Sequence, residues 1–213
     1  YVESGNTLCG PFVGKVMASA LAMGESNACM KRIVAAPTAG ACGVLPAVLV
    51  NYQKEKGTAD EQIVRALYTA AGIGQVVAAR AYIAGASGGC QAEIGTASAM
   101  AAGALTALGG GTPSQITHAA AMALKNLLGL VCDPVGGLVE VPCVKRNVIG
   151  SVNALSAADM ALAGIISRIP PDQVIDAMRE VGDQMHPSLR ETGQGGLANT
   201  PAAREWCAAQ EEE

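Results

Sequence analysis

The sequence has 213 residues, enough for one domain, or at most two, with a substantial core. Half of its residues are hydrophobic but only 3% are aromatic, so we expect a core of small aliphatic side chains on closely packed helices. With 14 basic and 18 acidic side chains the formal charge is -4, and because no large basic cluster is present we do not expect binding to nucleic acid.

No membrane span or export signal is evident. The segment between Glu93 and Lys125 carries no formal charge if His118 is neutral, but "GGGTPSQ" interrupts it and its two arms are rich in Ala and Gly. We interpret these arms as buried helices. Because no basic and apolar signal peptide opens the chain and the seven cysteines are odd in number, we expect a reducing cytoplasm with free thiols.

Hydrophobic periodicity predicts helices along most of the chain, and no run alternates between apolar and polar residues. The predicted helices, in chain order, cover residues 14–24, 60–83, 91–108, 112–128, 147–168 and 170–185. Thr112 and Pro113 favour a helix start, and Gly129 favours a helix end. We therefore predict an all-α fold in a single domain, 1–213, whose N-terminus is incomplete because the chain begins at Tyr1 without a Met.

Three glycine-rich loops between these helices are the candidates for chemistry. The first, "AAPTAGACGVLPAVL" at 35–49, leads into an apolar helix whose first amides favour a carboxylate or phosphate, although it also fits an ordinary helix entry. The second, "GASGGCQAEIG" at 85–95, places Cys90 at a helix start, where the dipole favours a thiolate; the alternative is a small buried hydrophobe. The third, "GLVCDPVGGLVEVPCVKRN" at 129–147, carries Cys132 and Cys143; the alternative is two unrelated core cysteines that flank a turn.

Taken together, the loops favour a sulfur-ligated metal. Cys90, Cys132 and Cys143 each lie next to turn-forming residues, whereas Cys29 has a helix-like context. With only two histidines in the chain, a His-rich zinc site is disfavoured. Three cysteines suit an iron–sulfur cluster with one iron left open, and an open iron is a Lewis acid.

These motifs resemble those of the iron–sulfur-dependent L-serine dehydratases, specifically their α subunit or α domain. The resemblance runs through "SGNTLCGPFVGKVMASALAMGE", "RIVAAPTAGACGVLPAVL", "GASGGCQAEIG", "AMALKNLLGLVCDPVGGLVEVPCVKRN" and "MHPSLRETGQGGLANTP". It implies a [4Fe-4S] cluster on Cys90, Cys132 and Cys143, and conversion of L-serine to pyruvate and ammonia without pyridoxal phosphate. It also implies a homo- or hetero-oligomer containing a β subunit or domain with a Ser-His-Thr-type motif, which this chain lacks.

The reaction suggests roles for further residues. Removal of water from serine has two requirements. The charge of the departing hydroxide must be neutralised, which an open iron can do, and the substrate carboxylate must be bound in a fixed position. Lys125, near a helix end, is the candidate for carboxylate electrostatics or proton transfer; the alternative is a surface lysine that interacts with the helix dipole. The predicted substrate-binding residues are Thr38, Ala39, Gly40, Ala41, Arg146 and Asn147.

Several questions stay open at this point. With only His118 and His186 able to titrate near neutrality, we expect the catalytic base to lie on another chain. Cys207 is interpreted as a stray thiol. The alternative functions are a related iron–sulfur lyase acting on cysteine or another β-substituted amino acid, a pyridoxal-phosphate lyase imitated by "PTAGACG" and Lys125, an iron–sulfur electron carrier, and a helical scaffold without catalysis.

Overall fold

The structure is a computed structural model and describes residues 1–211, so the last two acidic residues of the tail lie outside the described part. Residues 1–211 form helices and helical turns and no strand, which confirms the predicted all-α class. The helices are α1 (Gly10–Ala28), α2 (Val44–Lys56), α3 (Asp60–Arg80), α4 (Gly85–Gly88), α5 (Thr96–Leu108), α6 (Pro113–Lys125), α7 (Cys143–Leu162), α8 (Pro171–Gln184) and α9 (Pro201–Glu211). Short turns are η1 (Ala39–Ala41), η2 (Gln91–Gly95), η3 (Val135–Gly137), η4 (Pro187–Leu189) and η5 (Gly196–Asn199).

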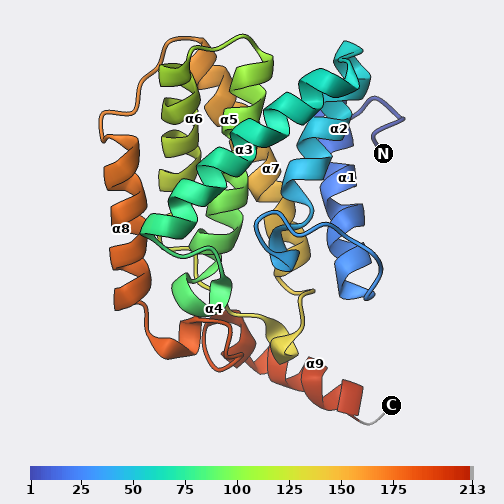
Figure 1. The fold of residues 1–213 in the computed structure, drawn as a ribbon. Coiled ribbons are helices and arrows are strands. Elements are labelled where there is room, and N and C mark those ends of the chain that lie inside the picture. Colours follow the sequence, from blue (N-terminus) through green and yellow to red (C-terminus); the bar gives the residue numbers. More distant parts are fainter. Residues whose placement is uncertain (212–213) are drawn as a thin grey trace.

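Helix α5 is the centre of the bundle, with α3, α6 and α7 packed around it (Figure 1). Every residue from Thr96 to Thr106 is buried, and most of them are Ala, Gly, Ser or Thr. Small side chains let neighbouring helices approach closely: a Cβ added at Gly103 would collide with Ile73 of α3. The low aromatic content is therefore explained by close helix packing around α5.

The observed helix ends differ from the predicted ones near the glycine-rich loops. Helix α6 ends at Lys125 rather than at 128, and the chain turns through to Gly129, which has φ +84°. Helix α7 begins at Cys143 rather than at 147, directly after Pro142, and ends at Leu162 rather than at 168 because the chain reverses at Gly164, with φ +89°. The predicted 147–168 helix is therefore displaced toward the N-terminus, and Cys143 lies on a helix rather than in a loop.

The predicted 91–108 helix consists of two different parts. Its first turn, η2, is a π-helix over Gln91–Gly95, and the α-helical part α5 follows without a break. A π turn within a helix widens the backbone locally and is often found at functional sites. Periodicity alone does not distinguish this turn from an α-helical one, so the sequence prediction missed it.

One end of the bundle collects the segments that carry the candidate residues. Helix α4, the connection between α6 and α7, the start of α7 and the turns η4 and η5 meet at the lower end of the view in Figure 1. Two backbone hydrogen bonds fasten this region: Cys132 N–H donates to Leu189 O, and Glu191 N–H donates to Cys132 O, both at 2.8 Å. None of the helices within residues 1–211 combines the length and the apolar character needed to cross a lipid bilayer.

Candidate cysteine site

Three buried cysteines from separate parts of the chain meet at this end of the bundle. Cys90 lies between α4 and η2, Cys132 follows α6, and Cys143 is the first residue of α7; they are 1%, 3% and 7% exposed. The thiol of Cys132 donates a hydrogen bond to the sulfur of Cys90, and Cys143 is near enough to feel the charge of Cys90. The structure thus brings together the three cysteines selected from the sequence.

The other two cysteines discussed above lie elsewhere. Cys29 is exposed at the C-terminal end of α1. Cys207 is half-buried in α9, beside Gly136 of η3.

Glycines next to the cysteines leave room for sulfur. A Cβ added at Gly85 would lie 2.7 Å from Cys132 Sγ, and one added at Gly89 would lie 2.7 Å from Met185 Sδ. Gly89 also has φ +76°, a conformation that residues with a side chain rarely adopt. The glycines of "GASGGC" therefore allow the close approach of Cys132 and the turn that leads into Cys90.

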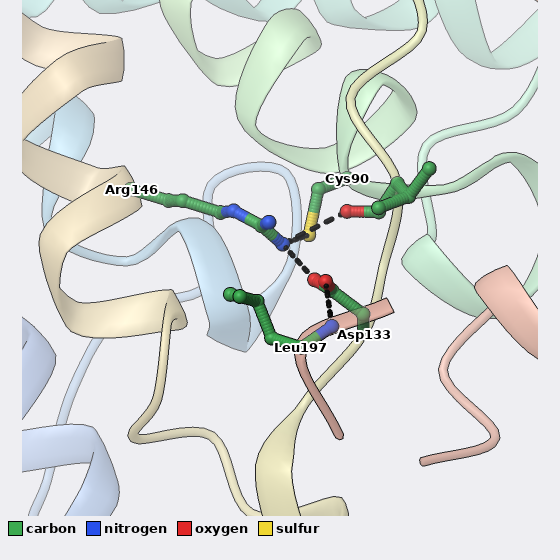
Figure 2. Close-up of polar contacts among 5 residues, drawn as sticks. Cys90, Asp133, Arg146 and Leu197 are labelled. Carbon is green, nitrogen blue, oxygen red and sulfur yellow. Dashed lines mark hydrogen bonds and ion pairs between the residues drawn. The ribbon is translucent and has the colours of Figure 1, made fainter. Parts of the chain in front are cut away.

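Arg146 links Cys90 to a buried carboxylate that the sequence analysis missed (Figure 2). Its Nη1 atom lies 2.8 Å from Asp133 Oδ1, donates to Val131 O at 2.8 Å and to Cys90 Sγ at 3.5 Å. Asp133 Oδ2 in turn accepts a hydrogen bond from Leu197 N–H at 2.8 Å. The guanidinium is therefore held beside the sulfur by contacts on two sides, and Asp133 also connects the site to η5.

The thiols have unequal acidities because of these neighbours. The hydrogen bond from Cys132 is the largest factor that lowers the pKa of Cys90, and the charge of Arg146 lowers it further. The same hydrogen bond, together with burial, raises the pKa of Cys132. Burial, followed by the charge of Cys90, raises the pKa of Cys143 to about 12. Cys90 is thus the thiol that the protein itself favours as a thiolate.

The donor set has the chemistry expected of an iron–sulfur cluster site. No group of three His, Cys, Asp or Glu side chains within residues 1–211 is arranged to hold one metal ion. In a multi-iron cluster each thiolate binds a different iron, so the sulfurs do not converge on one point. Three buried sulfur donors also match the preference of such clusters for soft ligands. Cys90, Cys132 and Cys143 are the residues that would hold it.

The loop predicted to hold a carboxylate does so, but the carboxylate belongs to the protein. Thr38 donates its hydroxyl proton to Glu93 Oε1, and the Gly40 N–H also donates to the Glu93 carboxylate. A Cβ added at Gly40 would lie only 2.5 Å from Glu93 Oε2. Two of the donors predicted to grip the substrate are therefore engaged by Glu93 in this structure. Of the other two loop residues, Ala39 is exposed, and the Ala41 N–H donates to Thr38 O at 3.3 Å.

Glu93 and Asp133 are functional candidates that the sequence analysis did not select. Glu93 follows Cys90 by three residues, a spacing that places both side chains on one face of a helical turn. That spacing was a usable signal. Asp133 directly follows Cys132, but its partners Arg146 and Leu197 are distant in the sequence, so nothing local indicated its buried ion pair.

Asn147 fixes the same loop to α7. Its Nδ2 donates to Gly40 O at 2.8 Å and to Cys143 O at 3.0 Å, and its Oδ1 accepts from Gly43 N–H at 2.8 Å. The side chain is 2% exposed. Both polar atoms of Asn147 are engaged by the backbone, so this side chain holds the "PTAGACG" loop against the start of α7.

Lys125 contacts the connection between α7 and α8. Its Nζ atom lies 3.5 Å from Ser167 Oγ, in the connection between α7 and α8. Ser167 in turn donates to Ile169 O at 2.7 Å. The hydrogen bond of Lys125 thus points it toward the α7–α8 connection and not toward a cysteine or the "PTAGACG" loop.

A groove of about 380 Å³ lies at the opposite end of the bundle, between the ends of α2, α5 and α7. Phe12, Tyr52 and Leu155 are among its lining residues, and no cysteine lines it. It offers apolar surface without the chemistry of the cysteine site, so we place the candidate site at the cysteines.

Comparison with known proteins identifies the family of the chain. The family described as "Serine dehydratase alpha chain" matches residues 2–198. The chain is 57% identical over 205 residues to the "Probable L-serine dehydratase, alpha chain" of Bacillus subtilis, covering 96% of this chain and 68% of that protein. It is 51% identical over 200 residues to the "L-serine dehydratase, alpha chain" of Peptoniphilus asaccharolyticus, covering 94% and 68%.

Longer relatives match over a smaller part of their own length. The "L-serine dehydratase TdcG" of Escherichia coli is 48% identical over 181 residues, which are 84% of this chain but 40% of that protein. The match of the family to residues 2–198 includes the three cysteines, the "PTAGACG" loop, Arg146 and Glu93. This chain therefore belongs to the serine dehydratase alpha chain family.

Proposed function

We propose that this chain is the cluster-carrying α chain of an iron–sulfur L-serine dehydratase, which converts L-serine to pyruvate and ammonia. The observation that carries the proposal is the meeting of Cys90, Cys132 and Cys143 at one buried site, within a chain whose relatives are named L-serine dehydratase. A pyridoxal-phosphate lyase would need a Schiff-base lysine beside its phosphate-binding loop, whereas the Lys125 ammonium group contacts Ser167 in the α7–α8 connection.

The site's own residues prepare the cysteines for iron. When bound, a [4Fe-4S] cluster supplies a Lewis-acidic iron that helps the hydroxyl group of the substrate to leave. Arg146 donates to Cys90 Sγ and stabilises the thiolate form, the form in which cysteine binds metals. Asp133 fixes the guanidinium in that position. Burial of all three cysteines keeps water away from the reacting groups and strengthens the electrostatic interactions among them.

The removal of the Cα proton needs a base, and His186 is used within its own turn. His186 accepts a hydrogen bond from Ser188 N–H at 3.2 Å, and its Nδ1 also lies 2.8 Å from Ser188 Oγ, so it caps the η4 turn. We propose that a β chain, implied by the name "alpha chain" of the relatives, completes the pocket and contributes the base. A cytoplasmic location belongs to the same proposal, because exposed free thiols suit a reducing compartment.

Metal content and turnover test the proposal together. The chain is purified anaerobically, and iron and acid-labile sulfide are measured. Pyruvate formation from L-serine is then followed with and without the β chain. We expect about four irons and four sulfides per chain, which is the composition of a cubane cluster. We also expect turnover to need the β chain. Serine turnover by protein free of iron and sulfide would refute the cluster, and full activity of the α chain alone would refute the shared site.

A further inference from the structure

Glu93 has no role in the proposal so far, although it lies in the site. It comes from the π turn η2, three residues after Cys90, and its charge raises the pKa of both Cys132 and Cys143. Its carboxylate is fixed from the opposite side by Thr38 and by the Gly40 N–H. A side chain held this firmly at the edge of the cysteine site is positioned to contact whatever binds there.

Glu93 lacks an oppositely charged partner within residues 1–211. None of the ion pairs formed within residues 1–211 includes Glu93. Arg146, the cation of the site, is engaged by Asp133, Val131 O and Cys90. Burial raises the pKa of Glu93, and the nearby carboxylate of Glu191 raises it further. A largely buried carboxylate next to a second one is costly unless a cation joins them.

Glu191 is exposed to solvent but adds negative charge on another side of the site. Its backbone has φ +63°, and its N–H is fastened to Cys132 O at 2.8 Å. Its Oε2 atom lies 3.4 Å from the position of a Cβ added at Gly85, the residue that also faces Cys132 Sγ. The second carboxylate is therefore turned toward the cysteines, and the site has acidic groups on two sides.

We propose that Glu93 binds the α-ammonium group of the substrate and makes the site selective for amino acids over hydroxy acids without that group. The inference rests on the proposed function and names the residue that recognises the amino group. Thr38 and Gly40 use only part of the four or so acceptor positions of a carboxylate, and an ammonium group has three donors. A hydroxy acid without an amino group would leave the charge of Glu93 unpaired, which is how buried polar groups reject incomplete ligands.

Substitution Glu93→Gln tests whether Glu93 binds the ammonium group or transfers a proton. Glutamine keeps an oxygen that accepts from Thr38 but has no charge, so the loop keeps its anchor while the ammonium group loses its counter-ion. In the α–β complex we expect KM for L-serine to rise about 10- to 100-fold, the range of a hydrogen bond to a charged group, and kcat to change far less. A fall in kcat at unchanged KM would overturn the proposal and make Glu93 the proton-transfer residue.

A purely structural role of Glu93 would not change ligand selectivity, so selectivity is the second measurement. Dissociation constants for L-serine and for 3-hydroxypropionate, which is serine without its amino group, are measured by calorimetry on the α–β complex. We expect Glu93→Gln to weaken L-serine about 10- to 100-fold and to leave 3-hydroxypropionate unchanged or tighter. Equal weakening of both ligands would overturn the proposal, because it would indicate a distorted pocket.

Two further variants keep the test decisive. Glu93→Asp retains the charge with a shorter side chain, so it should keep the preference for L-serine even where both ligands bind more weakly. Glu180→Gln removes an exposed carboxylate whose hydrogen bond is to Gln184 within α8, and it should leave both dissociation constants unchanged. The wild-type complex tests the underlying function separately: if it neither binds nor turns over L-serine, the proposed function fails, and this inference fails with it.

Discussion

Arg146 and Asp133 form an ion pair that is almost closed to water: the atoms Nη1 and Oδ1 are 2.8 Å apart, and the Asp133 side chain is 3% exposed. Removing one partner of a buried pair leaves an uncompensated charge, which is much costlier than removing both. This ion pair joins the segment after α6 to the start of α7 and, through Leu197, to the turn η5. Its loss should therefore be measurable in the stability of the whole chain.

Asp133→Asn should lower the free energy of unfolding by about 3–5 kcal/mol, because the guanidinium loses its counter-ion. The double variant Asp133→Asn/Arg146→Met should recover part of this loss. Urea unfolding of the cluster-free chain measures both. The control is Arg65→Gln, which removes an exposed pair with Glu61 and should change the stability by less than about 1 kcal/mol. Equal effects of the single and double variants would contradict a coupled pair.

Cys132→Ser should abolish both the brown colour of the cluster and serine turnover, because a hydroxyl is a poor replacement for a thiolate ligand of iron. Cys29→Ser is the matched control, since Cys29 is exposed at the end of α1. It should keep nearly full colour and activity. The measurement is iron content per chain with an absorbance spectrum, and similar losses in both variants would indicate that the cysteines serve folding in general.

Gly85→Ala should prevent cluster binding without a change in ligand identity. The added Cβ would lie 2.7 Å from Cys132 Sγ, so the sulfur must move. We expect a folded chain by circular dichroism with strongly reduced iron content after reconstitution. Gly72→Ala in α3 has open space around its added Cβ and should bind iron normally, while gaining about 0.5–1 kcal/mol of stability from helix propensity. Normal iron binding by Gly85→Ala would mean that the sulfur is not confined.

Glu93→Gln should make the cluster-free chain more stable at neutral pH. Burial raises the pKa of Glu93 above its ordinary value, so the native state binds this proton more tightly than the unfolded state. The stabilisation by the proton is complete below the unfolded pKa and is lost as the pH rises through the native pKa. The advantage of the glutamine variant should therefore be largest at neutral pH and should shrink as the pH falls toward about 4.

Urea unfolding at a series of pH values measures this difference, with Glu180→Gln as the control. Glu180 is exposed and hydrogen-bonds to Gln184 within α8, so its replacement should not change the pH dependence. A stability difference for Glu93→Gln that stays constant from acid to neutral pH would show that lost hydrogen bonds to Thr38 and Gly40, and not the charge, determine the effect.

The fold was largely predictable because helix signals are local. Thr112 forms a capping box with Gln115, and Pro171 opens α8 close to the predicted start. The ends near Cys143 and Gly164 were misplaced because they depend on turns whose geometry is set by distant contacts. Within the site, the three cysteines could be predicted because turn-forming residues flank them and because their motifs resemble those of a known family. The partners of Asp133, by contrast, are far along the chain, and contacts of that kind leave no periodic trace in a sequence.

The π turn at Gln91–Gly95 makes the number of residues in this segment as important as their identity. A π turn contains more residues than an α turn, so removing one residue, such as Ala92, would let the segment join α5 as ordinary α-helix. Helix α5 and its packing would remain, and Cys90 would keep roughly its direction because an ordinary turn replaces the wide one, but the spacing of Cys90 and Glu93 would fall from three residues to two, about 200° apart on an α-helix. Among aligned sequences, a one-residue gap between Gly89 and Thr96 would therefore mark a protein in which the cysteine and the glutamate no longer face the same site.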